Sequence, residues 1–152
     1  MTALTTARVD FVIVGGIALV LHGSARITRD LDICYLRERD ALKRLARALA
    51  PFQPTLRGAP PGLPFTLDWQ TLQSGLNFTL TTTAGDIDLL GEMAGIGGYP
   101  VVARFGQAME IYGQRITVLS LEGLERAKRA AGRHKDLLDL ADILEIRRQT
   151  GQ

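Results

Sequence analysis

Residues 15–33 read GGIALVLHGSARITRDLDI, and this stretch decides the expected fold. Gly15 and Gly16 directly follow an apolar, β-branched run, and the stretch closes on Asp30 and Asp32, which are separated by one residue. A hydrophobic core needs neither adjacent glycines nor closely spaced carboxylates. Free N–H groups at the start of a helix bind phosphate, and paired carboxylates bind a hard cation. The stretch therefore predicts a phosphate-binding loop followed by a metal-binding pair.

The composition is that of a globular protein. The chain has 152 residues, of which 46% are hydrophobic and 22% are charged, so we expect one domain spanning residues 1–152. The net charge of +2 and the pI of about 9.0 are compatible with a nucleotide or nucleic-acid partner. The single cysteine, Cys34, excludes an internal disulfide and favours a cytoplasmic location. The apolar run at residues 11–21 is too short to cross a bilayer, so no membrane association is expected.

Hydrophobic periodicity and turn residues predict an α/β or α+β domain built on a mixed β-sheet flanked by helices. Its core is a strand, the Gly-Gly loop, a helix and a second strand, and further helices lie near the C-terminus. The expected strands lie at residues 9–14 and 31–36 and in antiparallel hairpins at residues 77–90 and around Gly113. The expected helices lie at residues 17–23 and 37–50, from Ser120 to Gly132, and at residues 134–148.

Two segments are expected to lie outside regular structure. Five of the six prolines fall at residues 51–64, which predicts an internal loop with neither strand nor helix. Residues 149–152 are expected to form a disordered tail.

Asp30 and Asp32 are expected to project from the same face of a strand, because side chains alternate along it. Two carboxylates about 4 Å apart repel by about 4 kcal/mol at an effective dielectric constant near 20. A magnesium ion relieves this repulsion and accepts carboxylate oxygens as ligands. The alternative is a turn-capping aspartate beside a surface ion pair with Arg26 or Arg29.

The Gly-Gly loop has rival interpretations as well. A tight strand-to-helix turn without a ligand would also use glycines. The dinucleotide pattern G-x-G-x-x-G fails, because Ile17 and Ala18 stand where further glycines are needed, and no Gly-Lys-Ser/Thr of a Walker loop follows.

A third carboxylate is expected from the hairpin AGDIDLL at residues 84–90. Asp88 stands between the apolar residues Ile87 and Leu89 within a strand, whereas Asp86 adjoins Gly85 at the turn. We therefore assign the third acid to Asp88.

The Gly-Gly loop, the apolar-flanked Asp-x-Asp and the later lone acid together resemble the nucleotidyltransferase fold of the DNA polymerase beta type. The stretches GGIALVLHGSARITRDLDI, GDIDLL and RAKRAAGRHKDLLDL look most like small AbiEii-type nucleotidyltransferase toxins, over roughly residues 9–145. The resemblance implies a catalytic site with two Mg²⁺ ions on three acids, Asp30, Asp32 and Asp88. It also implies a nucleotide site formed by Gly15, Gly16, Arg26, Thr28 and Lys128. For Lys128, a solvated helix lysine is the alternative.

The resemblance implies transfer of a nucleoside monophosphate (NMP) from a nucleoside triphosphate (NTP) to an acceptor hydroxyl, with release of pyrophosphate. The implied acceptor is a tRNA 3′ end or a protein side chain, and the implied role is the toxin of a toxin–antitoxin pair with a cognate antitoxin. Two alternatives remain open. One is an antitoxin-type minimal nucleotidyltransferase that modifies a partner protein, and the other is a non-catalytic module that binds nucleotide or a partner.

Overall fold

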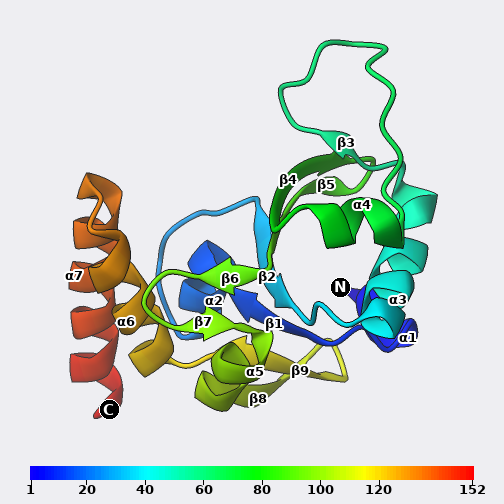
Figure 1. Cartoon of the computed structure of the whole chain (residues 1–152). Coiled ribbons are helices and arrows are strands. Elements are labelled where there is room, and N and C mark those ends of the chain that lie inside the picture. The colour runs from blue at the N-terminus through cyan, green and yellow to red at the C-terminus, as the bar shows by residue number, and fades with distance from the viewer.

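A computed structural model describes residues 1–152 and shows a mixed seven-stranded sheet flanked by helices (Figure 1). The strand order is β3-β4-β5-β2-β1-β9-β8. The strands are β1 (Phe11–Val14), β2 (Leu31–Tyr35), β3 (Thr55–Leu56), β4 (Asn77–Thr82), β5 (Gly85–Leu90), β8 (Gly106–Ile111) and β9 (Gln114–Leu119), and a separate pair consists of β6 (Glu92–Met93) and β7 (Gly97–Gly98). The α-helices are α1 (Thr2–Thr6), α2 (Gly15–Leu21), α3 (Arg39–Leu49), α4 (Trp69–Ser74), α5 (Tyr99–Val102), α6 (Leu121–Ala131) and α7 (His134–Thr150), and the 3-10 helices are η1 (Ala50–Phe52) and η2 (Ala103–Phe105).

The expected core of strand, glycine loop, helix and strand is confirmed, as is the α/β class with a mixed sheet. All four residues of β1 are buried, because the strand lies in the middle of the sheet between β2 and β9. Strand β1 is antiparallel to β2 and parallel to β9, and β2 is parallel to β5. Helix α2 starts at Gly15, directly after β1.

The later elements also follow their local signals. Strands β4 and β5 form one antiparallel hairpin, and β8 and β9 form the other. Ser120 caps α6 by accepting a hydrogen bond from the backbone N–H of Gly123. Gly132 ends the same helix in the left-handed conformation, which a glycine adopts without steric cost.

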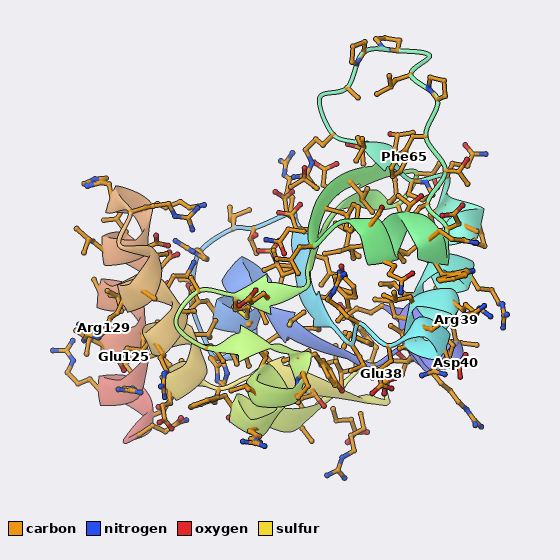
Figure 2. The ribbon with its side chains drawn as sticks, in the orientation of Figure 1. Glu38, Arg39, Asp40, Phe65, Glu125 and Arg129 are labelled. Carbon is orange, nitrogen blue, oxygen red and sulfur yellow. The ribbon has the colours of Figure 1, made fainter.

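The proline-rich segment is more ordered than expected at its start. Residues 50–52 form the 3-10 helix η1, with Pro51 in its first turn, where a missing N–H costs nothing. Residues 55–56 form the edge strand β3, which pairs with β4. The rest of the segment projects from the sheet as a loop, and the half-buried Phe65 packs against the core at its base (Figure 2).

The expected tail at residues 149–152 is also partly wrong. Helix α7 continues through Thr150 and ends at Gly151, which has a φ of +74°. The glycine, rather than the last apolar residue, terminates the helix. None of the helices is both long and apolar enough to span a lipid bilayer.

We predict that Leu89→Ala lowers the free energy of unfolding by about 2–5 kcal/mol, because the substitution leaves a cavity in the core. Leu89 is fully buried and lies between Ile33 of β2 and Phe78 of β4. Urea denaturation measures the loss. The control is Ile27→Ala, at a side chain that is 92% exposed, and it should stay within about 0.5 kcal/mol of wild type.

Candidate active site

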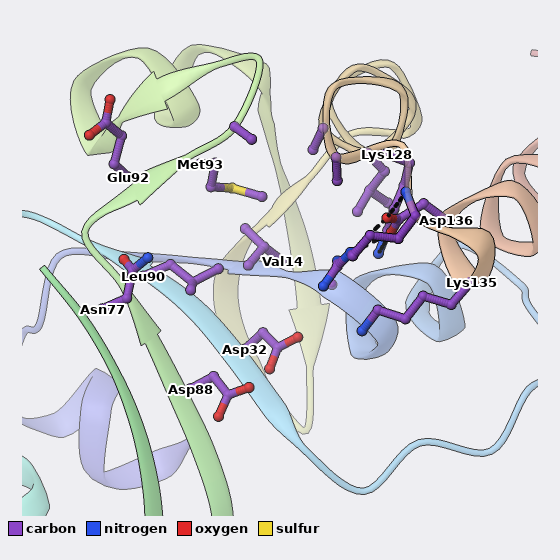
Figure 3. A pocket seen from close by; sticks show the side chains of 16 residues that line it. Val14, Asp32, Asn77, Asp88, Leu90, Glu92, Met93, Lys128, Lys135 and Asp136 are labelled. Carbon is purple, nitrogen blue, oxygen red and sulfur yellow. Dashed lines mark hydrogen bonds and ion pairs between the residues drawn. The ribbon is translucent and has the colours of Figure 1, made fainter.

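Two of the predicted acids lie directly opposite each other on neighbouring strands. In the parallel pairing of β2 with β5, Asp32 is in register with Asp88, and Val14 of β1 is the partner of Asp32 on its other side. Figure 3 shows both carboxyl groups projecting into the same pocket. The two like charges therefore lie close together, which raises the pKa of Asp32.

The glycine loop lies against the Asp32 carboxylate. A Cβ atom at Gly15 would lie 2.2 Å from Oδ2 of Asp32, closer than any side chain tolerates. Gly15 also has a φ of +67°, a conformation that favours glycine. At Gly16, a Cβ atom would lie 3.0 Å from Oγ1 of Thr28. The glycine loop therefore lies in close contact with Asp32, and this contact and the positive φ both favour glycine at position 15.

Asp32 is the most perturbed carboxyl group of the site. Burial, together with the nearby charges of Asp88 and Asp30, raises its pKa from the ordinary 3.8 to about 7, while Lys128 opposes the shift. Its Oδ1 atom is buried and has no hydrogen-bond partner in the protein. A buried carboxylate oxygen without a partner is costly, so this atom fits a group supplied from outside the chain.

The sequence predicts that Asp30 and Asp32 share a strand, but this is wrong, because β2 begins one residue after Asp30, at Leu31. Asp30 is exposed at the end of the loop that precedes the strand. No three acidic, histidine or cysteine side chains come close enough together to form a metal site by themselves. Mg²⁺ commonly binds one or two carboxylates together with phosphate oxygens and water, and Asp32 with Asp88 fits that donor set.

The pocket around these acids has a volume of about 400 Å³. The acids and the glycine loop form one side of it, with Val14, Gly15, Asp32 and Asp88. Helices α6 and α7 and their junction contribute three cationic side chains, Lys128, Arg133 and Lys135. The remaining wall comes mainly from β4 to β6 and the residue after them, with Asn77, Leu90, Glu92, Met93 and Ala94. A negative and a positive surface therefore share one cavity, an arrangement suited to a metal-bound polyphosphate.

Lys128 lines this pocket and is not a freely solvated lysine. Its side chain is 14% exposed, and Nζ lies 2.9 Å from Oδ2 of Asp139 and 3.4 Å from Oδ1 of Asp136. Asp136 is fully buried, and its hydrogen bond from the Arg133 side chain lowers its pKa to about 2. The Asp136 carboxylate also accepts the backbone N–H of Arg133, which fixes the start of α7.

Arg26 lies outside the pocket lining. Its guanidinium forms an ion pair with Asp139 of α7, so neither Asp30 nor Asp32 receives it. The Ser24 hydroxyl donates to Asp142 of the same helix. These two contacts hold the loop before β2 against α7. Asp139, the partner of Arg26, also forms an ion pair with Lys128.

Arg57 is a site residue that sequence reasoning missed. Its Nη2 donates a hydrogen bond of 2.7 Å to Oδ1 of Asp88, and its Nε lies 3.2 Å from Oδ2 of Asp86. Asp86 is therefore in an ion pair on β5, not at a free turn as expected. No local signal marks Arg57, because it stands in the proline-rich segment, 31 residues before Asp88.

Solved structures with the same architecture include a protein from Thermotoga maritima assigned as a nucleotidyltransferase, with a TM-score of 0.59 and 20% identity over 95% of this chain and 87% of that one. An antigenic nucleotidyltransferase-like protein from Paracoccidioides brasiliensis has a TM-score of 0.57 and 17% identity, over 95% of this chain and 70% of that one. The lincomycin-bound lincosamide antibiotic adenylyltransferase LnuA has a TM-score of 0.55 and 16% identity, over 94% of this chain and 90% of that one. The chain has the nucleotidyltransferase fold. No family model and no curated protein sequence matches it, so the AbiEii-type likeness is not established.

We predict that Gly15→Ala destabilises the protein by about 1–3 kcal/mol more than Gly113→Ala does, because only the first substitution forces an atom into a neighbour. Both glycines have positive φ, +67° and +75°, but nothing lies within 4 Å of a Cβ atom at Gly113. The difference between the two unfolding free energies in urea isolates the contact with Asp32. Equal losses would mean that the loop does not press on the carboxylate.

The raised pKa of Asp32 makes stability depend on pH. The folded protein keeps this proton up to about pH 7, whereas the unfolded chain releases it near 3.8, so the stability contributed by this group falls between those values. Asp32→Asn mimics the neutral acid. Both proteins are melted in the presence of a chelator. The melting temperature of Asp32→Asn should be slightly above that of wild type at about pH 4.5, and the difference should be largest at about pH 8. A gap that does not grow with pH would contradict the assignment.

Proposed function

We propose that the protein transfers an NMP from an NTP to an acceptor hydroxyl and releases pyrophosphate. The observation that carries the proposal is the partly buried Asp32 carboxyl, which lies against Gly15 and in register with Asp88. A non-catalytic nucleotide-binding module needs no paired carboxylates, and it would not retain two that repel each other. The nucleotidyltransferase fold of the chain supports the same conclusion.

In this proposal the Gly-Gly loop and the cationic side chains bind the triphosphate. The backbone at Gly15 and Gly16 begins a helix, so its N–H groups face the phosphates without an intervening side chain. Lys128, Arg133 and Lys135 line the same pocket and offset phosphate charge. Because Asp136 and Asp139 fix Lys128, its ammonium group is already in position before substrate arrives.

Asp32 and Asp88 hold the divalent metal in this proposal, with Asp30 as the further acid that the sequence predicts. When bound, Mg²⁺ would neutralise the phosphate oxygens and the charge of the leaving pyrophosphate. The acceptor oxygen attacks the α-phosphorus, the bond to the bridging oxygen of the β-phosphate breaks, and the acceptor proton leaves through Asp88 or water. Arg26 and Thr28 act from the loop that supports these acids.

The acceptor is proposed to be polyanionic, with the tRNA 3′ end as the first candidate. The pI of about 9.0 favours nucleic acid over a neutral acceptor. A protein side chain is the second candidate. The AbiEii-type likeness, a cytoplasmic location and a toxin role with a cognate antitoxin belong to the same proposal. An antitoxin-type enzyme that modifies a partner protein remains the alternative role.

We predict that Asp88→Asn abolishes transfer while NTP still binds, whereas Asp86→Asn keeps most of the activity. Asp88 is in register with Asp32. Asp86 lies two residues earlier on β5 and contacts Arg57. The measurement is single-turnover transfer from each radioactive NTP to bulk tRNA, to added protein and to lincomycin, alongside NTP binding for both variants. An inactive Asp86→Asn beside an active Asp88→Asn would show that the third carboxylate is misassigned.

A further inference from the structure

The third carboxylate already has a cation. Arg57 approaches Asp88 from the side of β4, with Nη2 at 2.7 Å from Oδ1. The same guanidinium lies 3.2 Å from Asp86 through Nε. Because Asp86 and Asp88 share one face of β5, a single guanidinium contacts both carboxylates and offsets part of their repulsion.

Arg57 is held by more than these two ion pairs. Its Nη2 also donates to the carbonyl oxygen of Leu80 at 2.9 Å, and its backbone N–H donates to the carbonyl oxygen of Thr79 at 3.0 Å. The side chain is only 30% exposed. Moving the guanidinium away from Asp88 would therefore break its contacts with Asp86, Asp88 and Leu80 together.

The surroundings of Asp32 differ from those of Asp88. No basic side chain forms an ion pair with it, and its buried Oδ1 has no hydrogen-bond partner. Its Oδ2 faces the glycine loop, where the phosphates are proposed to bind. Asp32 can therefore accept a cation from outside the chain, whereas Asp88 is already paired with the guanidinium of Arg57.

We propose that Arg57 takes the place of one of the two metal ions expected at this site. A single divalent cation then enters with the triphosphate on the Asp32 side, and the guanidinium stays on Asp88 as the second positive charge. A second divalent ion on Asp88, beyond the one that Asp88 shares with Asp32, would meet like charge from the guanidinium a few ångströms away, which disfavours it. Arg57 is thus a positioning residue, and this inference rests on the proposed function.

The experiment counts metal ions directly. Mn²⁺ and the non-transferable analogue α,β-methylene-ATP are added to wild type, Arg57→Gln, Arg57→Lys and Arg44→Gln, and bound manganese is measured by elemental analysis and electron paramagnetic resonance. Arg44 is the matched control, because it forms an ion pair of 2.8 Å with Asp10 on an exposed surface. We expect one uncoupled Mn²⁺ per chain for wild type, Arg57→Lys and Arg44→Gln. Arg57→Gln should bind two Mn²⁺, with the spin-coupled spectrum of ions about 3.5–4 Å apart.

Each other outcome overturns a defined claim. Two Mn²⁺ in wild type, or one in folded Arg57→Gln, overturns the role of Arg57 and leaves the transfer proposal standing. No Mn²⁺ in wild type with the α,β-methylene analogue of any of the four NTPs overturns the proposed function itself. Circular dichroism melting verifies that each variant is folded. If Arg57→Gln does not fold, the wild-type count decides, since one ion supports the inference and two contradict it.

Discussion

The parallel register of β2 against β5 is the constraint on which the site depends. It places Asp32 opposite Asp88, so two carboxyl groups are forced together in a partly buried pocket. This repulsion has to be offset by surrounding groups. Gly15 gives the space, Arg57 neutralises one carboxylate, and Lys128 lowers the pKa of the other against the effect of burial.

Charged side chains on the C-terminal helices also help to hold the pocket together. Helix α7 turns Asp136 and Asp139 inward, where hydrophobic residues would be expected in an ordinary amphipathic helix. These acids bind Lys128 on α6 and Arg26 in the loop before β2. The contacts connect the helix pair, the loop and the pocket through ion pairs with little exposure, and breaking one partner of such a pair is strongly destabilising.

Much of the fold could be predicted because its signals are local. The glycines after β1, the two hairpins and the Ser120 cap each depend on neighbouring residues, and all are present. The site was less accessible to sequence reasoning. Asp32, Asp88 and Gly15 follow motifs, but Arg57 reaches Asp88 only through the pairing of β3 with β4 and of β4 with β5.

The remaining differences have the same origin. Asp30 lies just before β2, in a loop that Ser24 joins to Asp142 of α7, a contact over more than a hundred residues. The inward direction of Asp136 could not be read from a helix whose charges alternate with leucines on both sides. Periodicity describes which residues share a face, but it does not decide which face a partner covers.

Strands β2 and β5 are adjacent in the sheet but far apart in the sequence, so they are synthesised at different times. Asp32 is made well before Asp88, and the partners of Lys128 come later still, at residues 136 and 139. A parallel pairing of this kind closes slowly, because a long loop must be ordered first. The Gly-Gly loop and Asp32 are therefore made before Asp88 and before the residues of α6 and α7 that line the same pocket, so the pocket can be completed only late in synthesis.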